Sequence, residues 1–391
     1  MKQNFFYFLL VVLFCTGEIQ ACSGDQNNLL LPDEEQKELN ISAMHGVCRQ
    51  NLQWMNHGEV VEIANNIANS HIPVVRINGV KERGSIEQVI HNINSFSNKG
   101  IKVLLVQPMW MDMFPEGYEK VTGPNYKLYR MSDIDLDRFR SFMNELLEQL
   151  AIHTPADALI GLELFNEANW GGFNGDLQPT SEGKGEVFTL ETPLNHPSFQ
   201  AIYTGILQYG KCLEITKDLM NDHFTGRDVK LVTTGLVSGG ERNNYRWSIN
   251  NGFTVIATNM FMTLLQGKHP EQTEKTNWLQ FADGIGIHAY PALVDNMEND
   301  LRTYYFDPIN AVLDTPMPYW MTEWGFSRPQ FQNNGGEKRR LHYARNFIKA
   351  IETIGGTVMT ALYEFDATNE YNIWENGALL ESGKIFQEII D

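Results

Sequence analysis

The 391-residue chain is short of positive charge and of cysteine, and each shortage argues against a class of function. Lys and Arg total 30 against 48 Asp and Glu, so the formal net charge of -18 disfavours nucleic acid and anionic lipid as partners. Four cysteines without a CxxC pair, and no HExxH sequence, give no indication of a zinc site. With 42% hydrophobic residues and eight tryptophans, the chain is not intrinsically disordered and can bury a large core.

The apolar run at residues 5–14 is too short for a transmembrane helix. Lys2 precedes it and Ala21 follows it, so residues 1–21 are predicted to be a secretory signal peptide. The sequence Ile19-Gln20-Ala21-Cys22 resembles the lipobox of bacterial lipoproteins, which implies lipidation of Cys22. Residues 22–40 are then a flexible tether, and residues 41–391 one folded domain. This predicts a lipid-anchored protein of the bacterial cell envelope, on a periplasmic or outer-surface membrane. Secretion after cleavage near Ala21 is the alternative.

Two cysteines remain in the folded part, Cys48 and Cys212. They are far apart in sequence and do not make a disulfide framework. The interpretation that we favour is two buried free thiols. The alternative is one disulfide between them in an oxidising compartment.

Apolar, β-branched segments alternate with segments of helical periodicity along the chain. This alternation predicts a (β/α)8 barrel. An open doubly wound sheet is the competitor, but no G-x-G-x-x-G sequence follows an early strand. The predicted strands lie at 45–54, 72–77, 101–106, within 158–170, and at 229–236, 284–290, 319–324 and 357–365; the predicted helices lie at 60–68, 85–96, 136–150, 199–220, 253–265, toward 313 with a break at Pro308, at 337–354 and from 383 onward.

A barrel of this kind carries its catalytic residues at the carboxyl ends of the strands. Glu167 follows the fourth strand and Glu323 lies in the seventh, so the two face each other across the barrel mouth. A pair of carboxylic acids flanking a bond is what glycoside hydrolysis requires. Glu364 and Asp366, after the eighth strand, are rival carboxylates. Glu163 shares strand parity with Glu167 and is assigned a structural role.

Four short sequences resemble motifs of clan A glycoside hydrolases, most closely family 5, which contains cellulases and mannanases: VVRI, LELFNEANW, HAY and PYWMTEWGF. The resemblance implies that Glu167 is the acid/base and Glu323 the nucleophile. It implies further that Asn166 binds the sugar 2-hydroxyl and that His288 lines the site. Tyr290 would hydrogen-bond the nucleophile, and Arg76 would keep Glu323 ionised.

The chain departs from the family pattern at three places. A histidine commonly ends the third strand, where this chain offers Gln107 or Trp110. Ala168 follows the fourth-strand glutamate in place of proline. A tryptophan commonly ends the eighth strand, where this chain offers Tyr363 or Phe365. Stacking on sugar rings, or packing under loops, is open to the aromatic residues Trp110, Trp170, Trp324, Tyr363 and Trp374.

Together these features predict a retaining β-glycoside hydrolase, without metal or cofactor, acting as a monomer on a carbohydrate. A plant-type or other β-linked glycan is expected, with β-glucan or β-mannan favoured and endo action favoured over exo action. The segment 171–196, long enough to have a role of its own, would wall one side of the cleft. The alternative is a lipid-anchored glycan-binding protein on a degenerate hydrolase scaffold.

Overall fold

The computed structural model describes residues 42–193, 195–238, 245–367 and 370–389. The predicted signal peptide, Cys22 and the tether to residue 40 lie outside these ranges. In the described part of the chain, no helix is both long and apolar enough to span a bilayer. Cys48 and Cys212 are both buried free thiols, which confirms the interpretation favoured from sequence.

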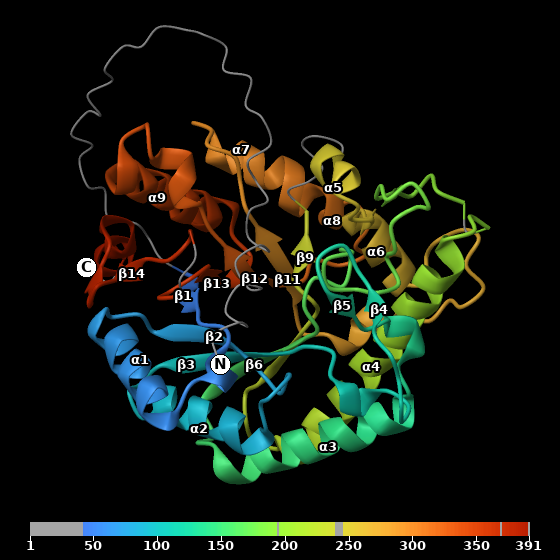
Figure 1. Ribbon diagram of the computed structural model, residues 1–391, viewed down its shortest axis with the longest axis horizontal. Helices are drawn as coiled ribbons and strands as arrows, with labels where there is room; N and C mark the ends of the chain where they lie inside the picture. The colour runs from blue at the N-terminus through green and yellow to red at the C-terminus, as the bar shows by residue number, and fades with distance from the viewer. Residues whose placement is uncertain (1–41, 194, 239–244, 368–369, 390–391) are drawn as a thin grey trace, which may run out of the picture.

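The strands close into a parallel barrel, as the alternation predicted (Figure 1). The sheet order is β8-β6-β3-β2-β1-β13-β12-β11-β9. Its two ends, β8 and β9, are halves of one strand, and bridges from Asn166 to Gly235 and from Val232 to Gly284 join that strand to both neighbours. The ring consists of β1 (Met44–Cys48), β2 (Val74–Asn78), β3 (Lys102–Gln107), β6 (Leu159–Leu164), β8 (Lys230–Val232) with β9 (Leu236–Val237), β11 (Ile285–Ala289), β12 (Tyr319–Trp324) and β13 (Thr357–Leu362).

Helices cover the outside of the barrel (Figure 1), and the longer ones present an apolar stripe to the strands. Polar caps fix where two of them begin. Ser85 accepts a hydrogen bond from the backbone of Gln88 at the start of α2, and Asn56 forms a capping box with Glu59 at the start of α1. The helices are α1 (His57–Asn69), α2 (Ile86–Ser97), α3 (Leu136–His153), α4 (Phe199–His223), α5 (Arg246–Asn250), α6 (Thr258–Leu265), α7 (Met297–Leu301), α8 (Asp307–Asn310), α9 (Gly336–Ile354) and α10 (Ile385–Glu388).

Several predicted elements have different bounds in the structure. The first strand ends at Cys48, because Asn51 adopts a left-handed conformation (φ 64°) and a 3-10 turn, Leu52–Trp54, follows. The predicted helix at 253–265 is a helix only from Thr258; the β-branched pair before it forms β10 (Val255–Ile256), which pairs with β7 (Val187–Phe188). The helix expected near Pro308 is divided into α7, a π-helical turn and α8, and Pro308 lies in the first turn of α8.

Long connections lie over the carboxyl ends of the strands and surround the site. The connection after β3 contains the hairpin of β4 (Val121–Thr122) and β5 (Lys127–Leu128). The connection after β6 packs against it, and the Gly175 amide donates to the carbonyl of Tyr129 at 2.7 Å. Asn169 donates to the carbonyls of Val237 and Ile256. These bonds hold the start of the 171–196 segment in place beside the strand ends.

Candidate active site

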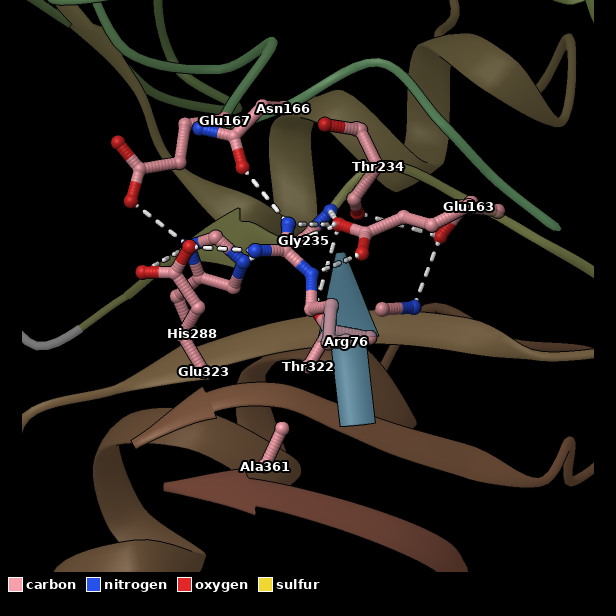
Figure 2. A network of polar contacts seen from close by, with 12 residues as sticks. Arg76, Glu163, Asn166, Glu167, Thr234, Gly235, His288, Thr322, Glu323 and Ala361 are labelled. Carbon is pink, nitrogen blue, oxygen red and sulfur yellow. Dashed lines mark hydrogen bonds and ion pairs between the residues drawn. The ribbon is translucent and has the colours of Figure 1, made fainter. Parts of the chain in front are cut away.

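Four predicted site residues from four different strands meet at the mouth of the barrel (Figure 2). Arg76 comes from β2, His288 from β11 and Glu323 from β12, while Glu167 follows β6. All four side chains are buried, and those of Arg76 and His288 are fully buried. Because buried charges must be paired, the contacts between these groups determine their protonation states.

The Glu323 carboxylate is held by three donors. Arg76 Nη1 lies 2.6 Å from Oε1, and Gln50 Nε2 lies 2.9 Å from the same oxygen. The Tyr290 hydroxyl donates to Oε2 at 2.7 Å. The contacts of Arg76 and Tyr290 are the ones expected from sequence, whereas Gln50 was not anticipated.

Glu167 lies in strained backbone. Its φ is 47°, and Phe165, two residues earlier, has a φ of 65°. Left-handed conformations at residues other than glycine cost about 1–3 kcal/mol each and persist only where neighbours enforce them. Here the Ala168 amide donates to Thr234 Oγ1 at 3.1 Å, which ties the turn to the fifth strand. The strained turn places the Glu167 carboxyl inside the mouth, facing His288.

The protonation state of Glu167 depends on burial and on His288. Burial raises the pKa of Glu167, and the hydrogen bond from His288 acts in the opposite direction. His288 Nδ1 lies 2.7 Å from Glu167 Oε1 and 3.6 Å from Glu323 Oε2. Burial opposes a charge on His288, but Glu323, Glu163 and Glu167 together raise its pKa to about 9. The His288 imidazole therefore lies between the two carboxyl groups, and its protonation is linked to that of Glu167.

Glu163 is the partner of Arg76 on the side away from Glu323, and Figure 2 shows the guanidinium between the two carboxylates. Its oxygens accept from Arg76 Nε at 2.6 Å and Nη2 at 3.1 Å, and also from the Gly235 amide and Thr322 Oγ1. Burial raises its pKa, but the charge of Arg76 and its hydrogen bonds outweigh burial and lower the pKa to about 2. Strand parity with Glu167 was the sequence signal for this inward position.

Asn166 joins the same network. Its Oδ1 accepts from Arg76 Nη2 at 2.8 Å, which orients the amide group. Among the residues that the structure describes, the side-chain nitrogen Nδ2 of Asn166 has no hydrogen-bond partner. Arg76 therefore positions both Glu323 and a side-chain donor beside it.

Two predicted sugar-stacking tryptophans are instead packed inside the protein. Trp324 is almost fully buried and stacks on Phe347 of α9, with ring centroids 4.0 Å apart. Trp170 is also buried and stacks on Phe253 at 4.7 Å. Of the two roles that the sequence left open, packing inside the protein is the one that the structure shows for Trp324 and Trp170.

Of the other aromatic residues predicted to bind sugar, one lies beside the site and two lie away from it. Tyr363 lies beside the site, its ring centroid 6.4 Å from that of Tyr290. Trp374 stacks on Phe365 at 5.3 Å. Trp110 donates to Asp112 at 3.0 Å and packs against the main core. These last two are partly buried and make no described contact with the four site residues.

Gln107 and the rival carboxylates have structural contacts. Gln107 bonds both the amide and the carbonyl of Val80, so it braces the connection after β2. Glu364 is buried beside Arg49 and the Gln50 amide, and burial raises its pKa to about 8. Asp366 pairs with Arg49. Neither carboxylate contributes to the contacts among Glu167, His288 and Glu323.

Glu167, His288 and Glu323 could also be considered as metal ligands, since each offers an atom within 4.8 Å of the others. The charges argue against this use. The positive charge of the Arg76 guanidinium, whose Nη1 lies 2.6 Å from Glu323 Oε1, disfavours a second cation beside the same carboxylate. The arrangement is better suited to a reaction in which one carboxyl group transfers a proton and the other attacks as a nucleophile.

No protein-family model and no curated protein sequence matches the chain. Solved structures share its fold. A family 39 glycoside hydrolase from Bacteroides cellulosilyticus WH2 has a TM-score of 0.54 and 13% identity over 88% of this chain, which spans 63% of that protein's length. Fungal β-1,4-galactanase (TM-score 0.57, 12% identity) matches 90% of this chain and 100% of its own. A GH5_18 protein from Streptomyces cattleya in complex with Manβ1-4GlcNAc (TM-score 0.53, 10% identity) matches 89% and 80%. At these identities the comparisons establish the barrel fold.

Proposed function

We propose that the protein is a retaining β-glycoside hydrolase of clan A, similar to family 5, that cleaves a β-linked polysaccharide or oligosaccharide. The observation that carries the proposal is the pair Glu167 and Glu323, which offer carboxylate oxygens within 4.8 Å of each other. Retaining enzymes hold their carboxyl groups about 5–5.5 Å apart, whereas inverting enzymes need about 6.5–9.5 Å to admit a water molecule. The glycoside hydrolases that share the fold support the same class of reaction.

In the proposed reaction, Glu323 attacks the anomeric carbon from the face opposite the leaving group. The bond to the glycosidic oxygen breaks as Glu167 donates its proton to that oxygen, and a covalent glycosyl-enzyme forms on Glu323. Glu167, now a carboxylate, takes a proton from a water molecule that releases the sugar and restores Glu323. The raised pKa of Glu167 suits a group that must begin protonated.

The remaining residues bind and orient. Arg76 offsets the charge of Glu323 between turnovers, and Tyr290 fixes its Oε2. The unpartnered amide of Asn166 is placed to donate to the sugar 2-hydroxyl. No step needs a metal or a cofactor.

The substrate we favour is a β-glucan or a β-mannan, cleaved within the chain, by a monomeric enzyme. A screen of β-linked polysaccharides with product analysis tests this. Internal cleavage gives a ladder of oligosaccharides, whereas action at chain ends gives a single small product. Binding without turnover across the screen would instead favour a glycan-binding protein on a hydrolase scaffold.

The pH dependence should follow Glu167. Because its protonated form is required in the first step and its pKa is raised, the proton donor should be fully in place below that pKa, and activity should decline as pH rises through it. We expect the basic limb of kcat/KM to lie above the ordinary glutamate pKa of about 4.3. Profiles of kcat/KM for a glycan substrate measure this. A basic limb at the ordinary carboxyl pKa would contradict the assignment of Glu167 as acid.

The location that we propose rests on the amino-terminal sequence alone. We propose that Cys22 carries the lipid that tethers the barrel to the bacterial envelope. The basis for this proposal is the lipobox-like sequence Ile19-Gln20-Ala21-Cys22. In a bacterial host, the wild-type protein should be found with membranes and take up a labelled fatty acid. Cys22→Ser should abolish the labelling. A wild-type protein that is soluble and unlabelled would favour secretion.

A further inference from the structure

Gln50 makes a contact with the nucleophile that the family resemblance does not assign. It lies two residues beyond the end of β1, and its Nε2 donates to Glu323 Oε1 at 2.9 Å. The amide nitrogen must be the atom that faces Glu323, because an ionised carboxylate only accepts hydrogen bonds. Gln50 therefore adds a donor to the oxygen that already accepts from Arg76.

The two oxygens of Glu323 are consequently not equivalent. An ionised carboxylate has about two acceptor positions on each oxygen. Arg76 and Gln50 occupy both positions on Oε1, whereas Tyr290 alone donates to Oε2. His288 Nδ1, which bonds Glu167, lies 3.6 Å from Oε2. Oε2 therefore faces the proton donor and retains an electron pair.

We propose that Gln50 is a positioning residue that selects the attacking oxygen of Glu323. With Arg76 it holds Oε1 in place, so that Oε2 forms the bond to the anomeric carbon. The bond from that carbon to the glycosidic oxygen breaks in the same step, and the proton of Glu167 goes to the leaving oxygen. This inference rests on the proposed function, and it deepens that proposal by assigning one atom and one additional residue.

The backbone N–H and carbonyl groups of Gln50 are both hydrogen-bonded. Its amide donates to Glu364 Oε1 at 3.3 Å, and its carbonyl accepts from Arg49 Nη1. Arg49 in turn contacts Glu364 and Asp366. The Arg49 amide donates to the Arg76 carbonyl at 2.8 Å. This network, which uses both rival carboxylates, places the Gln50 side chain relative to the same strand that carries Arg76.

Covalent trapping isolates the step that Gln50 should affect. The probe is a dinitrophenyl 2-deoxy-2-fluoro-β-glycoside of the sugar identified by the polysaccharide screen, because its good leaving group departs without help from Glu167. We expect Gln50→Ala to lower the first-order trapping rate about 10- to 100-fold, the effect of losing a hydrogen bond to a charged group. The half-saturating probe concentration should change little. Gln53→Ala removes a nearby amide with no described contact to Glu323 and should change the rate by less than about threefold.

Gln50→Glu separates positioning from a loss of structure. At neutral pH the introduced carboxylate repels Glu323, so trapping should be slower than in Gln50→Ala. As pH falls, the introduced carboxyl becomes protonated and can donate again, so the rate should rise relative to Gln50→Ala. Thermal unfolding establishes that each variant is folded. A wild-type rate in Gln50→Ala, or identical pH profiles in the two variants, would overturn the inference alone. A wild-type protein that no β-glycoside probe labels would overturn the proposed function and this inference with it.

Discussion

Replacing Glu323 with alanine is expected to reduce turnover of every β-glycoside by at least about 10⁴-fold, because no other group can form the glycosyl-enzyme. The loss should be the same for substrates with good and poor leaving groups, since the missing bond is needed for both. Steady-state rates on aryl β-glycosides and on the best glycan measure it. The folded state should persist, because Arg76 keeps its bonds to Glu163.

Glu323→Gln is the matched control for shape. It keeps the volume of the side chain but removes the nucleophile, so it should be as inactive as Glu323→Ala. Only the alanine variant leaves space for a small anion, and sodium azide should restore activity to it alone. Retention of more than about one hundredth of wild-type activity in both variants would contradict the role of Glu323.

Replacing Glu167 with alanine should give a loss that depends on the leaving group. A sugar leaving group needs the proton of Glu167, so glycan hydrolysis should decline about 10²- to 10⁴-fold. A dinitrophenyl leaving group departs as a stable anion, so formation of the glycosyl-enzyme should be nearly unchanged. Its breakdown still needs the base, and the intermediate should accumulate. A burst of dinitrophenol followed by a slow steady state is the expected observation.

Equal losses for both kinds of leaving group would contradict the assignment of Glu167. Ala168→Ser, one residue away, is a suitable control because it changes the same turn while keeping the backbone amide that bonds Thr234. It should retain the dependence on leaving group seen in the wild-type protein. His288 remains in both variants, so its interaction with Glu323 is not removed.

The barrel could be predicted because its strands are continuous apolar runs that alternate with amphipathic helices. The break between β8 and β9 could not. The break contains Gly235, where a Cβ would lie 2.1 Å from His288 Nε2. The imidazole of His288 on β11 therefore leaves no room for a side chain at this point of the fifth strand. Contacts of this kind join residues far apart in sequence and leave no periodic signal.

Site residues could be predicted from sequence where the end of the strand was placed correctly. They were missed where the predicted end of the strand was wrong. The first strand was expected to continue to residue 54, so Gln50 was counted within it, although it lies beyond the end at Cys48. Trp324 shows the opposite failure. Successive residues of a strand point to opposite faces, so a Glu323 that points into the barrel directs Trp324 outward to α9. Parity could have corrected that assignment from sequence alone.

The roles of the two carboxyl groups are tested most directly by the anomer of the glycosyl azide that each alanine variant forms from a dinitrophenyl β-glycoside. In Glu323→Ala, azide takes the place of the nucleophile and attacks once, so the account predicts the α-glycosyl azide. In Glu167→Ala, azide attacks the intermediate on Glu323 in a second displacement, so the account predicts the β-glycosyl azide. Proton NMR of the anomeric signal distinguishes the two products. The same anomer from both variants, or the reverse assignment, would contradict the mechanism.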